Sequence, residues 1–203
     1  VTGVQTCALP ISSTGNQVVN VNFGQRPFTY PPPAGYKALN TQNLPTPTIL
    51  NGANYMAAVT YTGNGTASTL ISATTTNSGN NALAKTFQPD LVWIKSRSAT
   101  TNHNLFDSVR TATKYISSNL TNAEATNANT LTAFNASTTS AGAGFTLGTD
   151  ASAIGVNVNA ATYVAWEWLA GGGTPTSGTG TSGVTNVQYS ANPSVGFSVV
   201  IYT

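Results

Sequence analysis

The feature that most constrains the fold is a short apolar run, Leu91–Ile94, near the middle of the chain. The turn-forming pair Pro89-Asp90 precedes it, and the polar stretch 96–101 follows it. Such a run between turn formers predicts a β-strand, because it is too short for a helix. Alternation divides the side chains of this strand between two faces: Val92 and Ile94 on one, and Leu91, Trp93, Lys95 and Arg97 on the other. Since both faces are apolar, we expect a central strand that is covered on both sides at its start.

A second strongly apolar segment, residues 162–169, is the natural partner of this strand. It carries Val164, Trp166 and Trp168 on one face. Two tryptophan-bearing strands so far apart in sequence indicate non-local pairing, which is typical of a β-sandwich. We therefore expect an all-β fold with a core drawn from these and shorter apolar segments: Val59, Leu91, Val92, Trp93, Ile94, Phe106, Phe134, Phe145, Val164 and Trp166.

The composition is poor in charge. Charged residues make up 6% of the 203-residue chain, against about 25% in ordinary soluble domains. Small uncharged residues replace them, as in extracellular and virion proteins. The net charge is +2, which is too little positive charge for a surface that binds nucleic acid. No apolar run approaches the roughly 20 residues that a membrane-spanning helix needs. We expect neither nucleic acid nor membrane insertion.

The two ends of the chain carry signals of their own. Residues 1–11 resemble the translation of a sequencing adapter, and the one cysteine, Cys7, lies there. We therefore exclude Cys7 from redox, metal and catalytic reasoning. At the other end, residues 197–203 echo the pattern of residues 56–62. This echo predicts that 186–203 is the first strand of a following, similar domain that is truncated.

Two predicted linkers separate the remaining segments. Residues 43–52 are rich in proline, and residues 173–185 are rich in Gly, Ser and Thr. Before the first linker, Val21–Phe28 and Pro32–Leu39 resemble the closing strands of SPRY domains, as found in phage virion proteins. The resemblance implies that residues 12–42 are the C-terminal remnant of a SPRY-like β-sandwich.

The region between the linkers, residues 53–172, carries four motifs in a fixed order. They are Phe87–Lys95, His103–Arg110, Gly144–Gly148 and Tyr163–Trp168. In this order they resemble a domain that recurs in phage tail-fibre and other virion proteins. The resemblance implies a concanavalin-like, or laminin-G-like, antiparallel β-sandwich.

The same resemblance implies a structural or adhesive role in a virion tail. The expected partners are a host-surface glycan and other virion subunits, assembled as a homotrimer in the intact fibre. Two alternatives use the same fold. One is a secreted bacterial adhesin or lectin module at the cell surface, and the other is an accessory domain of a carbohydrate-active enzyme. Gene neighbours and a full-length gene would separate these readings.

Acid–base chemistry has few candidate residues. The carboxylates are Asp90, Asp107, Glu124, Asp150 and Glu167. Glycoside hydrolysis needs two of them about 5–10 Å apart across the sugar, and no spacing in the sequence suggests such a pair. We therefore expect no enzyme activity and no cofactor.

The motif that holds His103, Asp107 and Arg110 has two readings. Asp107 would orient His103 as a general base in a hydrolase, but Ser108 lacks the glycine-framed turn of a nucleophile. In the other reading, which we favour, Asp107 and Arg110 form an ion pair that braces a strand end, with His103 in a loop.

Metal sites have weaker support. Thr149-Asp150 and Asn157–Asn159 offer hard oxygen ligands for calcium, but the clustered acidic pattern of a calcium loop is missing. Zinc has no cysteine partner for the one histidine once Cys7 is set aside. We expect no metal.

A ligand site has two candidate locations. The tryptophans and nearby cations would form a sugar-stacking platform: Trp93, Lys95, Arg97, Trp166 and Trp168. Tryptophans on central strands more commonly pack in the core, so both readings stay open. Contact at loops is the second possibility, because strands hold loops rigidly in a sandwich. The polar loops are 74–81, 98–104, 135–143 and 151–159.

Overall fold

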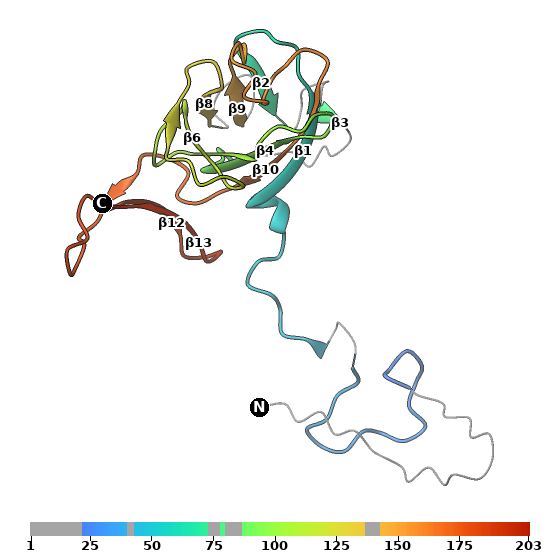
Figure 1. Ribbon diagram of the computed structural model, residues 1–203. Helices are drawn as coiled ribbons and strands as arrows, with labels where there is room; N and C mark the ends of the chain where they lie inside the picture. The colour runs from blue at the N-terminus through green and yellow to red at the C-terminus, as the bar shows by residue number, and fades with distance from the viewer. Residues whose placement is uncertain (1–21, 40–42, 73–77, 80–86, 137–142) are drawn as a thin grey trace, which may run out of the picture. The chain divides into compact units, whose positions relative to one another are not determined.

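The computed structural model describes residues 22–39, 43–72, 78–79, 87–136 and 143–203 (Figure 1). The chain divides into two compact units, residues 1–47 and residues 48–203. The division falls inside the predicted linker 43–52. In the first unit, none of the described residues lies in a strand, and Asn22 Oδ1 closes a local turn by accepting a hydrogen bond from the Gly24 N–H at 2.9 Å.

The larger unit is built on a seven-stranded antiparallel sheet. A short 3-10 helix, η2 (Gly52–Asn54), leads into its first strand. In spatial order the strands are β3 (Ser78–Gly79), β1 (Met56–Thr62), β10 (Thr162–Trp168), β4 (Leu91–Ser96), β5 (Asn104–Asp107), β6 (Lys114–Ser117) and β7 (Ala125–Thr126). The predicted pairing is present: β10 lies against β4, with Trp166 opposite Trp93.

A second sheet covers one face of the first, which we call the inner face. Its strands run in the order β2 (Thr69–Ser72), β9 (Gly144–Leu147) and β8 (Leu131–Asn135). The core fills the space between the two sheets: Val59, Tyr61, Ile71, Val92, Ile94, Phe106, Leu131, Phe145, Leu147, Val156, Tyr163 and Ala165. The fold is thus the all-β sandwich that the sequence predicted. Its concanavalin-like topology stays a prediction.

A third sheet, β11–β12–β13, lies on the other side of the seven-stranded sheet, the outer face (Figure 1). Its strands are β11 (Thr176–Ser177), β12 (Gln188–Asn192) and β13 (Phe197–Ile201). The prediction of a plain linker over 173–185 therefore needs correction, because β11 lies there. The prediction of one strand in 186–203 is corrected to a hairpin, which the compact unit 48–203 includes.

The predicted core was half right. Val59, Val92, Ile94, Phe106 and Phe145 are buried as expected. Phe134 packs against the core from a partly exposed position. Alternation turns four other predicted core residues to the outer face, where they remain partly exposed: Leu91, Trp93, Val164 and Trp166. Within the residues that the structure describes, no helix is long and apolar enough to cross a membrane.

Candidate functional site

A row of apolar side chains crosses five neighbouring strands on the outer face. Strand register aligns its members in the order Ala58, Trp166, Trp93, Leu105 and Ile116. We call this set the tryptophan row. The rings of Trp93 and Trp166 have centroids 5.4 Å apart and planes tilted by 58°. All five side chains keep some exposed surface, so the row offers apolar and aromatic contact at a sheet face.

His103 fixes the orientation of one of these rings. Trp93 Nε1–H donates a 3.1 Å hydrogen bond to His103 Nδ1, and the two ring centroids are 5.7 Å apart. An indole N–H can only donate, so His103 Nδ1 is the acceptor of this bond. His103 lies in the loop before β5 and bonds to Trp93 rather than to Asp107, as in the reading that we favoured from the sequence.

The other predicted binding residues divide into separate places. Trp168 stacks on Phe197 of β13, with ring centroids 6.2 Å apart, and so belongs to the contact with the third sheet. Lys95 Nζ donates to the backbone oxygens of Ser96 and Ala99 at 2.7 and 3.1 Å, which ties down the loop after β4. Arg97 is exposed just past the end of β4. Of the predicted platform, the structure thus brings Trp93 and Trp166 together on the outer face, where both are partly exposed.

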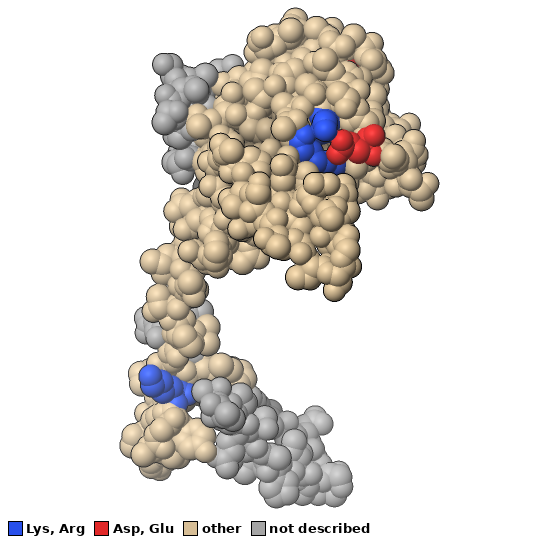
Figure 2. All heavy atoms as spheres, turned by 90° about the vertical axis from the view of Figure 1, so that its left-hand side faces the viewer, with Lys and Arg blue, Asp and Glu red and all other residues tan. Residues whose placement is uncertain are grey.

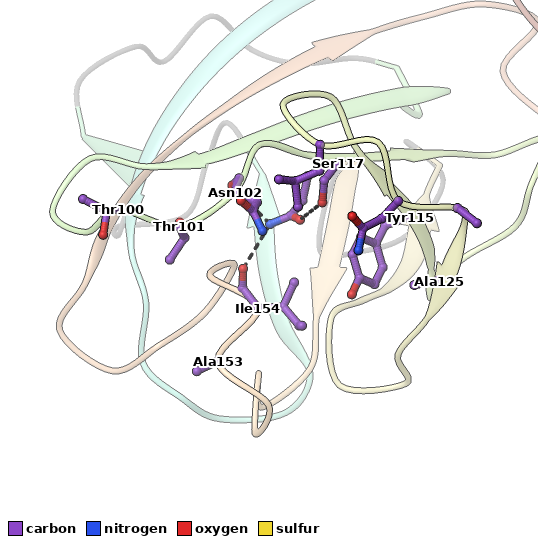
Figure 3. A pocket seen from close by; sticks show the side chains of 12 residues that line it. Thr100, Thr101, Asn102, Tyr115, Ser117, Ala125, Ala153 and Ile154 are labelled. Carbon is purple, nitrogen blue, oxygen red and sulfur yellow. Dashed lines mark hydrogen bonds between the residues drawn. The ribbon is translucent and has the colours of Figure 1, made fainter.

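A polar pocket of about 360 Å³ lies at a different place, on the inner side of β5 and β6. Figure 3 shows Thr100, Thr101 and Asn102 on one side, Tyr115 and Ala125 on the other, and Ala153 and Ile154 below. Its complete lining is Thr100, Thr101, Asn102, Asn104, Tyr115, Ser117, Leu120, Asn122, Ala123, Ala125, Ala153 and Ile154. None of these residues is charged.

Two of the predicted ligand loops contribute to this pocket. Loop 98–104 supplies one wall and loop 151–159 supplies Ala153 and Ile154. The stretch 115–125 was missed, although its run of Ser, Asn and Thr resembles the loops that were singled out. The other two predicted loops, 74–81 and 135–143, fall mostly outside the described residues.

The residues that could support hydrolysis are engaged in structural contacts. Arg110 Nη2 lies 2.5 Å from Asp107 Oδ2, which confirms the predicted ion pair. Ser108 Oγ donates a 2.6 Å hydrogen bond to Asp90 Oδ1 rather than to a histidine. Glu167 is fully buried on the inner face of β10, and Glu124 pairs with Lys114 at 3.4 Å on the surface.

Two buried aspartates each act as a hub for several donors. Asp90 accepts hydrogen bonds from Ser108 Oγ, Ser190 Oγ, Ala170 N and Gly172 N. Asp150 accepts from four successive backbone N–H groups, those of residues 154–157, at 2.9–3.0 Å. These bonds use the carboxylate oxygens that a calcium site at Asp150 would need. In the part of the chain that the structure describes, no three His, Cys, Asp or Glu residues gather as a metal site.

Two core tyrosines hold the loop that follows Asp150. Tyr61 Oη donates to the Val156 oxygen at 2.7 Å, and Tyr163 Oη accepts from the Val158 N–H at 3.0 Å. The rings stack with centroids 5.0 Å apart. Burial raises the pKa of Tyr61 well above its ordinary value, and the charges of Tyr163, Asp150 and Glu167 raise it further. Burial also raises the pKa of Tyr163, although the bond from Val158 opposes this shift.

Comparison with known proteins identifies a family without assigning an activity. Residues 51–203 match the family model described as a domain of unknown function, DUF7483. The match includes the sandwich, the third sheet, the tryptophan row and the polar pocket. A search of curated proteins and a search of solved structures found no match. The chain therefore belongs to the DUF7483 family.

Proposed function

We propose that this chain is a structural and adhesive module of a phage tail fibre, and that it binds host-surface carbohydrate without cleaving it. The observation that carries the proposal is the tryptophan row. Trp93 and Trp166 stand next to each other in strand register on the outer face. Partly exposed aromatic rings on a rigid sheet suit the apolar C–H faces of sugar rings.

The low surface charge supports a neutral partner. Almost all of the surface that Figure 2 shows is uncharged, and on this face the charged side chains of the larger unit lie at one place where both signs meet. A surface of this kind gives little electrostatic steering toward nucleic acid or other highly charged partners. Hydroxyl and amide groups dominate instead, and they form hydrogen bonds with sugar hydroxyls.

We propose binding without hydrolysis because the side chains that could catalyse it are already paired with other groups of the protein. Asp107 is paired with Arg110, Ser108 with Asp90, and His103 with Trp93. General acid–base and nucleophilic catalysis need such groups to face one another and a substrate. A single weak adhesive site would gain strength from repetition along a fibre.

A glycan array probed with the full chain in multivalent form tests the proposal. We expect binding to neutral glycans that Trp93→Ala and Trp166→Ala each weaken strongly. Tyr202→Ala is a matched control, because this aromatic side chain is 66% exposed and lies outside the row. Binding at unchanged strength in both tryptophan variants would contradict the proposed site, and release of sugar from the bound glycans would contradict the non-catalytic role.

The virion assignment needs a separate observation. The complete gene with its neighbours tests it, because tail-fibre genes lie among other phage structural genes. Neighbouring genes for bacterial secretion would favour the secreted adhesin instead.

A further inference from the structure

We propose that the polar pocket is a second binding site, separate from the tryptophan row, for a neutral polyhydroxylated ligand of the size of a small sugar. The pocket holds about 360 Å³, within the ~300–1,000 Å³ typical of small-molecule sites. Its lining combines amides and hydroxyls with the apolar surfaces of Leu120, Ala125 and Ile154. Sugars present the same mixture of hydroxyl groups and C–H faces.

Strand alternation places the pocket and the row on opposite faces of the same strands. In β5, Asn104 lines the pocket while its neighbour Leu105 belongs to the row. In β6, Tyr115 and Ser117 line the pocket while Ile116 belongs to the row. Side chains of adjacent strand residues point to opposite faces. One ligand therefore cannot occupy both sites, and their binding can be measured separately.

The pocket has amide and hydroxyl groups that are free to donate and accept hydrogen bonds. Across the residues that the structure describes, the Asn122 amide, the Thr100 hydroxyl and the Tyr115 hydroxyl make no hydrogen bond to protein. Thr101 Oγ1, on the same wall as Thr100, is buried with no partner. Amides and hydroxyls both donate and accept, as sugar hydroxyls do.

The lining also excludes a charged ligand. No acidic or basic side chain lines the pocket. An ionised group that entered would lose hydration without a counter-charge, which costs free energy. The geometry therefore favours a neutral sugar over an acidic sugar or a phosphate ester.

Internal hydrogen bonds hold the walls in place before a ligand arrives. Asn104 is fully buried, and its Nδ2 donates to the Ile154 oxygen at 3.1 Å, which fixes the floor (Figure 3). Asn119 Nδ2 donates to Asn102 Oδ1 at 3.1 Å and steadies the wall above. The Asp150 hub fixes the loop that carries Ile154. A preformed site loses less conformational entropy on binding.

Amide NMR of the full chain, titrated with glucose, galactose, mannose and N-acetylglucosamine, tests the inference. We expect at least one of these sugars at millimolar concentration to shift amide signals of residues 100–104 and 115–123. The indole signals of Trp93 and Trp166 should not follow the same curve. Tyr115→Phe and Asn122→Ala should each weaken this binding about two- to tenfold, as loss of one hydrogen bond predicts.

Matched variants separate this site from the tryptophan row. Tyr115→Phe keeps the ring that packs near Phe106, with centroids 5.8 Å apart, so it tests the hydroxyl alone. Asn159→Ala is the control for Asn122→Ala, because Asn159 is exposed and lies outside the pocket. Trp93→Ala should leave the pocket shifts intact even where it abolishes array binding. The inference is overturned if none of the four sugars shifts the pocket amides, or if glucuronate binds there as tightly as glucose.

Discussion

Asp90 and Ser190 are 100 residues apart in sequence, and Ser190 Oγ donates a 3.0 Å hydrogen bond to Asp90 Oδ1. The other oxygen, Oδ2, accepts from the Ala170 and Gly172 N–H groups at 2.8 Å each. Asp90 immediately precedes the central strand β4, and Ser190 lies in β12. A buried carboxylate therefore joins the sandwich to the third sheet.

Replacing Asp90 with alanine should lower the free energy of unfolding by about 3 kcal/mol or more. The substitution leaves two backbone N–H groups and two hydroxyls without their acceptor, and each unsatisfied buried group costs about 1–3 kcal/mol. Ser190→Ala removes one of these bonds and should cost about 1 kcal/mol. Urea unfolding measures both variants. Equal, small effects of the two substitutions would show that Asp90 is not a hub.

A chain that ends at Gly172 tests whether the third sheet stabilises the sandwich. The sequence predicted that residues 53–172 are one sandwich bounded by linkers, but this shorter chain loses the Ser190 bond and the stacking of Phe197 on Trp168. Ser190 Oγ also accepts a 2.8 Å hydrogen bond from the Gly171 N–H, which the shorter chain loses as well. We expect it to fold with a free energy of unfolding about 2 kcal/mol lower or more, from two hydrogen bonds and one aromatic pair. Thermal unfolding of the long and short chains gives the comparison. An unchanged melting temperature would favour the boundary that the sequence predicted.

Local pattern was sufficient to predict the central strands. Four apolar residues between turn formers identified β4, and its tryptophan suggested the pairing with β10. Pattern was not sufficient to decide which face is the core, because Leu91 and Trp93 are as apolar as Val92 and Ile94. The position of the second sheet decides it, and that depends on contacts between residues far apart in sequence.

The polar pocket could not be predicted from local pattern either, because it also depends on contacts between residues far apart in sequence. Its walls come from three separate stretches of chain, near residues 100–104, 115–125 and 153–154. Each stretch reads as an ordinary polar loop on its own.

The echo between residues 56–62 and 197–203 was also ambiguous, because the matching patterns form strands with different neighbours. β1 lies between β3 and β10, whereas β13 is an edge strand beside β12.

The partly exposed position of Trp93 predicts a moderate loss of stability on its removal. Trp93→Ala should lower the free energy of unfolding by about 1–2 kcal/mol, because the ring is only partly buried. Phe106→Ala is the comparison, since this fully buried ring should cost about 3–5 kcal/mol. Denaturant unfolding of the two variants measures the difference. If both cost the same, Trp93 belongs to the core and the tryptophan row is not a free surface.

The raised pKa of Tyr61 predicts a loss of stability in alkali. Burial and the nearby charges of Tyr163, Asp150 and Glu167 make the folded state hold the Tyr61 proton to a higher pH than the unfolded chain does. The unfolded tyrosine loses its proton near pH ~10. Above that pH the unfolded state binds fewer protons than the folded state, so the free energy of unfolding falls as pH rises.

Tyr61→Phe tests this assignment. At neutral pH the variant loses the 2.7 Å bond to the Val156 oxygen and should be about 1 kcal/mol less stable. Above pH ~10 its stability should fall less steeply than that of the parent chain, because one group with a raised pKa is gone. Tyr163 still contributes a smaller fall, since its pKa is also raised. Tyr202→Phe, at a position that is 66% exposed, is the control and should follow the parent curve. Urea unfolding between pH 8 and 11 gives the slope of the free energy of unfolding against pH for each chain. If Tyr61→Phe and the parent chain have the same slope, a group other than Tyr61 causes the loss of stability in alkali.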